Sequence, residues 1–84
     1  MNDVQFEILD ELYFVISFKD IRASLDIEND TLLHQLREMV KKGWVKCFEK
    51  ETEIAISDID YSDEKFKSYL FLASKKGLFA HNSI

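Results

Sequence analysis

Residues 17–45 constrain the fold most, because they indicate two short helices joined by a tight polar turn and followed at once by a strand. Ser17 can cap the first helix through its hydroxyl group. In the second helix, Leu32 and Leu36 begin an apolar stripe at helical spacing. Gly43 ends that helix at a position suited to the left-handed conformation. Two helices with a turn of about three or four residues between them form a helix-turn-helix unit.

The rest of the chain is predicted to add a helix before this unit and strands after it. Helices are expected over residues 3–14, 17–25, 29–42 and 75–81, with Ser74 as the cap of the last one. Strands are expected over residues 44–57 and 65–73. Residues 44–57 can instead form two strands joined by a turn at residues 49–51. The link at Val15 and Ile16 is apolar, so we expect it to be buried.

A second interpretation stays open for the last predicted strand. Ser62 is a good helix cap, and Phe66, Leu70 and Ala73 would share one helical face. The density of aromatic and branched side chains over residues 69–72 favours a strand instead. We therefore expect a strand over residues 65–73, with a helix as the alternative.

Length and composition predict one domain with a rich core. The chain has 84 residues, of which 46% are hydrophobic, including seven Phe, three Tyr and one Trp. Its net charge is −5, and its single cysteine cannot form an internal disulfide, which suits a reducing compartment. No apolar run approaches the roughly 20 residues that span a bilayer. We therefore expect a cytoplasmic protein without a membrane segment.

The sequence gives little support to enzyme chemistry. It contains no glycine-rich phosphate loop and no paired histidine ligands. Cys47 has only His34 and His81 as conceivable partners at a metal, and their spacing matches no known ligand pattern. The expectation is a protein that is not an enzyme, with no metal, no cofactor and a buried, inert thiol.

Two patterns resemble those of a known family. Leu36, Met39 and the run Gly43-Trp44-Val45 resemble the end of the third helix in winged helix-turn-helix proteins, and residues 71–77 resemble the far strand of their wing. The resemblance is nearest to small bacterial transcription regulators of the MarR-like and PadR-like kinds. It implies an α+β fold: a three-helix head, an antiparallel β-hairpin wing and a short C-terminal helix, in one winged-helix domain over residues 1–84.

The resemblance also implies a function, which is sequence-specific binding of double-stranded DNA by a homodimer that regulates transcription. The third helix would enter the major groove, with Asp30 and Leu33 also on its reading surface, while the wing touches the backbone. Asn29 would suit an adenine, and Arg37 a guanine or a phosphate. The candidate DNA-binding residues are Asn29, Thr31, His34, Arg37 and Lys41.

An alternative function remains open, namely a protein-interaction module on the same scaffold that does not bind DNA. The predicted wing tip, residues 58–64, carries four acidic residues and no basic one, and it would face phosphates. If residues 69, 71 and 73 face the core, Leu70 and Leu72 point outward. With Phe79, they are the candidate interface for a second copy or for a protein partner.

Overall fold

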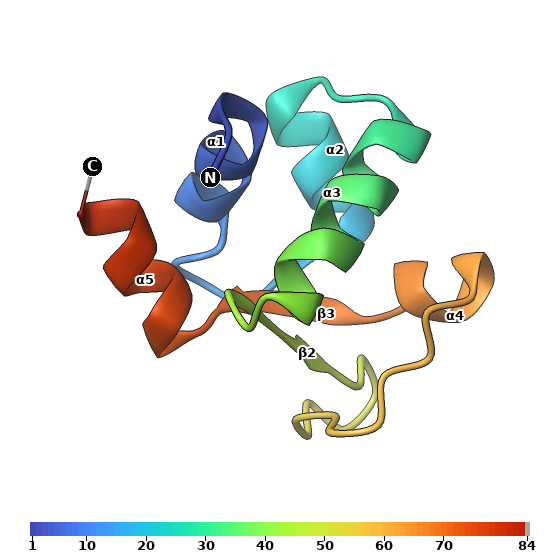
Figure 1. Cartoon of the computed structure of the whole chain (residues 1–84). Helices are drawn as coiled ribbons and strands as arrows, with labels where there is room; N and C mark the ends of the chain where they lie inside the picture. Colours follow the sequence, from blue (N-terminus) through green and yellow to red (C-terminus); the bar gives the residue numbers. More distant parts are fainter. Residues whose placement is uncertain (84) are drawn as a thin grey trace.

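The chain folds into five helices and a three-stranded antiparallel sheet, an α+β arrangement seen in a computed structural model that describes residues 1–83 (Figure 1). In chain order the elements are α1 (Asp3–Glu11), β1 (Ile16–Ser17), α2 (Phe18–Leu25), α3 (Asn29–Lys41), β2 (Val45–Phe48), α4 (Asp63–Lys67), β3 (Leu70–Ala73) and α5 (Lys75–Asn82). The order of helices and strands is compatible with a winged helix.

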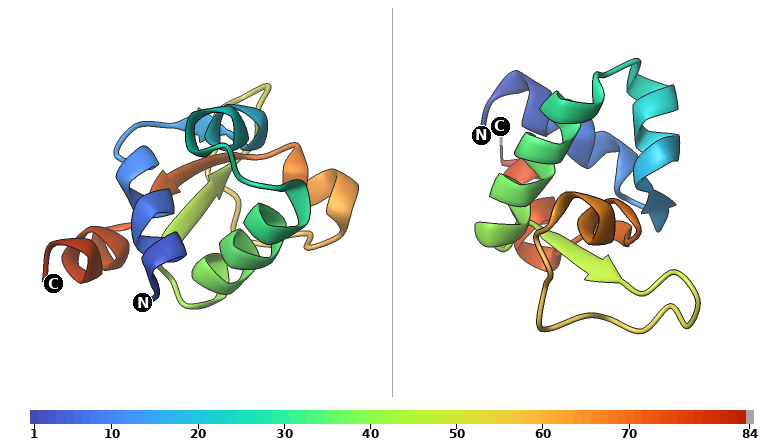
Figure 2. Two further views of the ribbon diagram at one scale, coloured as in Figure 1. Left: turned by 90° about the horizontal axis from the view of Figure 1, so that it is seen from above. Right: turned by 90° about the vertical axis from the view of Figure 1, so that its right-hand side faces the viewer.

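The sheet has the strand order β1-β3-β2, so the last strand lies between the first two. Phe71 of β3 is paired with Ile16 of β1 on one side and with Cys47 of β2 on the other. Helices α1, α2 and α3 lie over one face of the sheet, while α4 and α5 lie at its opposite ends (Figures 1 and 2). Because side chains alternate along a strand, the sheet has one face toward the helices and one away from them.

Local capping explains where the helices begin. Asn2 forms a capping box with Gln5 at the start of α1. The hydroxyl groups of Ser17 and Ser74 accept hydrogen bonds from the backbone N–H groups of Asp20 and Gly77, three residues further on. The predicted caps at Ser17 and Ser74 are confirmed, and each satisfies an N–H group that the first helical turn leaves free.

Helix α1 is shorter than predicted: it ends at Glu11 and not near residue 14. The carbonyl oxygen of Leu12 accepts a hydrogen bond from the backbone N–H of Ala73, 2.8 Å away, so the chain leaves the helix to join the sheet. The expectation of a buried link at Val15 and Ile16 is half wrong. Val15 is 44% exposed, whereas Ile16 is half-buried and packs against the core.

The core lies between the three N-terminal helices and the sheet. Its buried hydrophobic side chains are Ile8, Leu9, Leu12, Phe18, Ile21, Leu32, Leu33, Leu36, Met39, Val45, Cys47, Phe66, Tyr69, Phe71 and Ala73. The apolar stripe predicted for the third helix is therefore confirmed. Leu33 belongs to this core, which corrects its expected place on a reading surface, because an apolar side chain at this position gains more from burial than from solvent.

The strand predicted over residues 44–57 is in fact two shorter segments. β2 ends at Phe48, the chain turns, and Ala55 forms an isolated antiparallel bridge back to Phe48. Two backbone bonds of 2.9 Å, from Glu49 N–H to the Ile54 carbonyl and from Ile56 N–H to the Cys47 carbonyl, hold this return. The second interpretation, two strands with a turn, is the nearer one.

The strand predicted over residues 65–73 is half wrong. Residues 63–67 form the short helix α4, and only Leu70–Ala73 form a strand. Ser62 occupies the cap position of α4, although its side chain accepts no capping bond. The alternating burial of residues 69–73 is confirmed, so each rival interpretation describes one half of this segment.

A substitution at Gly77 tests the joint between α5 and the end of α3. A Cβ atom at Gly77 would overlap the backbone carbonyl of Trp44. Gly77→Ala should therefore lower the free energy of unfolding by about 3 kcal/mol, in the range of overpacked sites. Gly43→Ala is the matched control: its φ is +80° but only the Lys76 side chain is near, so it should cost about 1 kcal/mol. Urea denaturation measures both values, and equal losses would contradict the contact.

Candidate interaction surfaces

The third helix carries the five residues predicted to contact DNA, and they do not share one environment. Thr31, His34 and Lys41 are exposed, whereas Asn29 and Arg37 are half-buried. The side-chain amide of Asn29 donates to the carboxylate of Asp30 at 3.2 Å. The exposed members lie on α3 as expected, but Arg37 has other partners.

Arg37 is bound by the chain itself. Its guanidinium donates to the backbone carbonyl of Tyr61 at 2.7 Å and to the carboxylate of Asp63 at 2.5 Å. The guanidinium carbon also lies 5.9 Å from the ring centre of Phe66. Asp63 belongs to the predicted wing tip, so an acid expected to face phosphates neutralises the basic side chain expected to read bases.

These contacts fold one long segment against α3. We call residues 54–67 the return segment, because they lead from the turn after β2 back toward β3. The backbone N–H of Asp60 donates to the Tyr69 hydroxyl at 3.1 Å, and the Lys41 ammonium lies 5.2 Å from the ring centre of Tyr61. The two views in Figure 2 show this segment running beside α3 and β2. Tyr61 and Asp63 therefore hold the predicted acidic tip against α3, while its acidic side chains stay exposed.

Two titratable groups of the return segment, Tyr61 and Asp60, have shifted pKa values. Burial raises the pKa of the Tyr61 hydroxyl, and the negative charge of a Cys47 thiolate would raise it further. Hydrogen bonds from the backbone N–H and the hydroxyl of Ser62 lower the pKa of the exposed Asp60 carboxyl. Asp60 thus closes a local turn that leads into α4.

The structure joins two basic segments that the sequence analysis treated separately. The tripeptide Lys-Lys-Gly occurs at residues 41–43 and again at residues 75–77. The Ser74 hydroxyl donates to the Gly43 carbonyl at 2.5 Å, and the Ser74 N–H donates to the Trp44 carbonyl at 2.9 Å. The repeated Lys-Lys-Gly tripeptide is the feature of the sequence that could have indicated this basic patch. We call Lys41, Lys42, Lys75 and Lys76 the lysine end.

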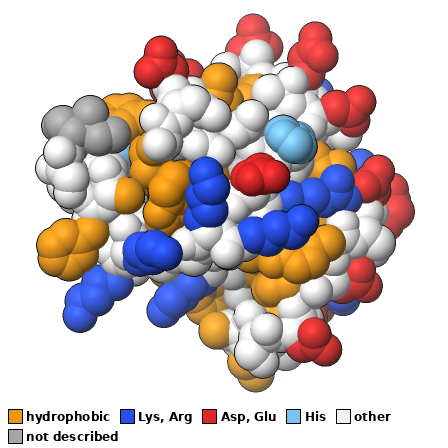
Figure 3. Space-filling model, in the orientation of Figure 1, with side chains coloured by type: hydrophobic (Ala, Val, Ile, Leu, Met, Phe, Trp, Pro, Cys, Tyr) orange, Lys and Arg blue, Asp and Glu red, His pale blue; other side chains and the backbone are white. Residues whose placement is uncertain are grey.

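Charge is distributed unevenly over the molecule. Figure 3 shows Lys and Arg side chains gathered across the middle and lower left of one face, with most Asp and Glu side chains along the upper and right edges. The four ammonium groups of the lysine end lie more than 4.0 Å from every carboxylate within residues 1–83. An overall charge of −5 therefore coexists with a local positive patch.

The face of the sheet turned away from the helices is largely apolar. Leu70 is paired with Ser17 on one side and Phe48 on the other, and Leu72 is paired with Lys46. We call the residues on this side the outer sheet face; they are Val15, Ser17, Lys46, Phe48, Leu70 and Leu72. The outward direction predicted for Leu70 and Leu72 agrees with their half-buried state between buried neighbours. Phe79 lies outside the sheet, on α5, and is 71% exposed.

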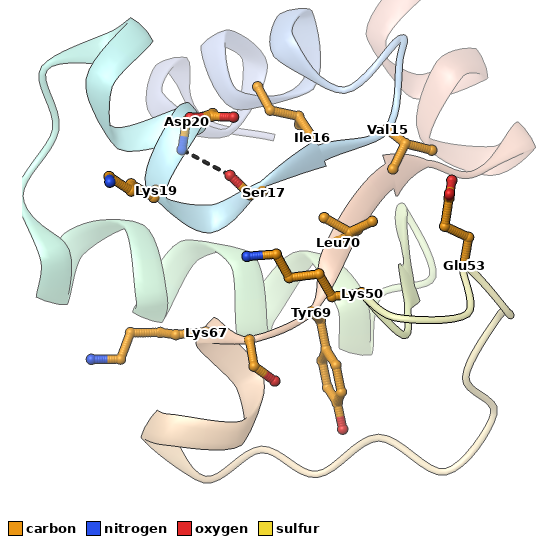
Figure 4. Close-up of a pocket in the computed structure, with 11 residues that line it drawn as sticks. Val15, Ile16, Ser17, Lys19, Asp20, Lys50, Glu53, Lys67, Tyr69 and Leu70 are labelled. Atoms are coloured by element: carbon orange, nitrogen blue, oxygen red, sulfur yellow. Dashed lines mark hydrogen bonds between the residues drawn. The ribbon is translucent and has the colours of Figure 1, made fainter.

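A shallow hollow of about 650 Å³ lies beside this face (Figure 4). Val15, Ile16 and Leu70 form its apolar part. Its rim carries charges of both signs, from Lys19, Asp20, Lys50, Glu53 and Lys67. Because the hollow is open and its charges are mixed, it selects no particular small molecule.

His81 connects α5 to α1. Its ring stacks on Phe6 with ring centres 4.1 Å apart, and it is almost fully buried. One ring nitrogen, Nδ1, lies 2.8 Å from the Tyr13 hydroxyl, and the other, Nε2, lies 2.9 Å from the carboxylate of Asp10. His81 is thus part of the helix packing, where it positions α5 for the contacts described above.

No protein family, no curated protein and no solved structure matches the chain. Of the helices within residues 1–83, none combines the length and the apolar character that a membrane span requires. Function has to be argued from the surfaces of this α+β domain.

The reactivity of Cys47 tests the packing of the return segment against β2. Burial raises the pKa of the Cys47 thiol to about 12, so almost none of it is thiolate at mildly alkaline pH. A disulfide reagent that yields a coloured product should therefore react only as fast as the protein opens, and at once after denaturation. Rapid labelling of the native protein would contradict a closed packing around β2.

Proposed function

We propose that this chain is a winged-helix domain that acts as a protein-interaction module, and that it associates with a second copy through the outer sheet face. The element order supports the winged-helix part of the proposal. A strand follows α1, two helices follow that strand, and two further strands complete an antiparallel sheet in the order β1-β3-β2. The α3 helix then stands where such folds carry their recognition helix.

The apolar outer sheet face is the observation that carries the interaction function. A sheet with one free face normally alternates apolar residues inward with polar residues outward. Here Phe48, Leu70 and Leu72 are turned away from the core, and neither α4 nor α5 lies across them (Figure 1). Contiguous apolar area of this kind marks interaction sites in small domains. A second copy would cover it with an equivalent surface.

The third helix gives weaker support to the other candidate function, a sequence-specific DNA-binding regulator. Arg37 is bound to the return segment, and α3 as a whole carries two acids, Asp30 and Glu38, against two bases, Arg37 and Lys41. Attraction to phosphates supplies the sequence-independent part of DNA affinity, and this side of α3 offers little of it. DNA reading stays a prediction. The residues that remain for it are Asn29, Thr31, His34 and Lys41.

Sedimentation over a wide concentration range tests the association. The wild type should form dimers whose population rises with concentration. The variant Leu70→Asp, Leu72→Asp should stay monomeric, because two carboxylates remove apolar area and repel their counterparts across a symmetric interface. The matched control is Ile54→Asp, which changes a 66% exposed side chain outside the outer sheet face and should leave the dimer intact. Circular dichroism verifies that each variant is folded.

Two outcomes would contradict the proposed interface: a wild type that is monomeric throughout, or a dimer that survives in the double Asp variant. A titration with a random DNA duplex at low salt addresses the regulator. The interaction module predicts that Arg37→Ala changes neither the affinity for duplex nor its salt dependence. A loss of affinity with a shallower salt slope in Arg37→Ala would favour the regulator.

A further inference from the structure

We infer that the lysine end, together with Phe79, is a binding surface for single-stranded nucleic acid, in which lysines contact phosphates and the aromatic ring stacks on an unpaired base. This inference does not depend on the proposed dimer, because it uses the C-terminal end of α3 and the start of α5 instead of the outer sheet face. Its basis is the local charge, the position of that charge on the helices, and one exposed aromatic side chain.

No carboxylate within residues 1–83 neutralises the charge at this end. The ammonium groups of Lys41 and Lys42 lie 5.2 Å and 4.9 Å from the ring centres of Tyr61 and Trp44, contacts that leave their positive charge in place. Arg37, Lys65 and Lys67 each lie within 4.0 Å of a carboxylate, whereas no member of the lysine end does so within residues 1–83. The Ser74 bonds hold the start of α5 against the end of α3, and lysines without carboxylate partners at this joint raise the local positive potential. A polyanion would be attracted to this end even though the molecule as a whole is acidic.

Helix electrostatics do not account for all four lysines. Lys41 and Lys42 lie at the C-terminal end of α3, where the helix dipole favours cations. Lys75 and Lys76 open α5, where the same dipole disfavours cations and favours acids, yet the first turn of α5 carries no acid. Their placement therefore costs some stability, which a bound anion would recover.

Phe79 supplies the second half of the site. It is 71% exposed and lies one helical turn after Lys75. The two side chains line a shallow hollow of about 240 Å³ together with Leu78 and Asn82. An exposed ring beside a cation is the arrangement that single-strand binding proteins use, because every base has a face that can stack.

A single strand fits this end better than a duplex does. In a duplex the bases are stacked on one another, so Phe79 would find no partner and only the lysines would contribute. In a single strand a base is free to stack on Phe79 while its neighbouring phosphates lie near Lys75 and Lys76. RNA and single-stranded DNA share this chemistry, and they differ in the 2′-hydroxyl and in the methyl group of thymine.

Fluorescence anisotropy with labelled oligonucleotides of about 16 nucleotides tests the inference. The probes are an RNA, a DNA of the same sequence and the corresponding DNA duplex, with inorganic polyphosphate as competitor. Both single strands should bind at low salt and more tightly than the duplex. Equal affinity for RNA and DNA indicates contacts to phosphate and base alone, and tighter binding of RNA adds a contact to the 2′-hydroxyl.

Two variants separate charge from stacking. Lys75→Gln, Lys76→Gln should make the slope of log affinity against log salt shallower by about 1.4, because each phosphate contact to a single strand contributes about 0.7. Phe79→Ala should weaken binding about tenfold and leave that slope unchanged. The matched controls Lys19→Gln, Lys50→Gln and Phe14→Ala change exposed residues elsewhere and should have little effect.

Several results would overturn the inference. They are no binding of either single strand at low salt, losses in the control variants as large as those in the test variants, or tighter binding of the duplex. Complete displacement by polyphosphate together with an unchanged affinity for Phe79→Ala would show that the surface is a general polyanion site. Sedimentation of Phe79→Ala completes the set, since loss of the dimer would assign Phe79 to association between copies instead.

Discussion

One guanidinium group links the third helix to the longest irregular part of the chain. Arg37 donates to the Tyr61 carbonyl and to the Asp63 carboxylate, across 24 and 26 residues of sequence. The ion pair with Asp63 is worth little by itself, because that carboxylate is 68% exposed. The bond to the backbone carbonyl and the contact with buried Phe66 add to it. Together they place the return segment beside α3, and with it the course of the chain into β3.

This arrangement divides the surface of the molecule by chemistry. The return segment lies against the middle of α3, where its Asp63 neutralises the positive charge of Arg37. The outer sheet face presents apolar side chains. The lysine end presents cations, and no carboxylate within residues 1–83 lies within 4.0 Å of them. We therefore propose two surfaces for partners on a fold whose element order is compatible with a winged helix, and neither is the reading face expected for the third helix.

The features predictable from sequence are those decided between near neighbours. The caps at Ser17 and Ser74 and the left-handed Gly43 each depend on bonds or angles within a few residues, and all three are present. The alternating burial of residues 69–73 follows from the two-residue period of any strand, although all five side chains are apolar. The return segment could not be derived, because it is held by Arg37 and by other contacts over long sequence separations. Likewise, the sequence places one Lys-Lys-Gly tripeptide at the end of a helix and the other at the start of a helix. Only the fold shows that the two tripeptides lie next to each other.

The state of the Arg37 side chain is the most direct test of this account. The chain has two arginines, so the side-chain N–H signals of Arg37 and Arg22 can be assigned in a magnetic resonance spectrum by replacing each with lysine. Arg37 is bound to Tyr61 and Asp63 through Nη2, whereas Arg22 donates to the Ile27 carbonyl through Nε. The Nη protons of Arg37 should therefore exchange with water more slowly than those of Arg22, and the Arg37 signals should not move when duplex DNA is added. Fast exchange at Arg37, or a shift of its signals with duplex, would contradict the account.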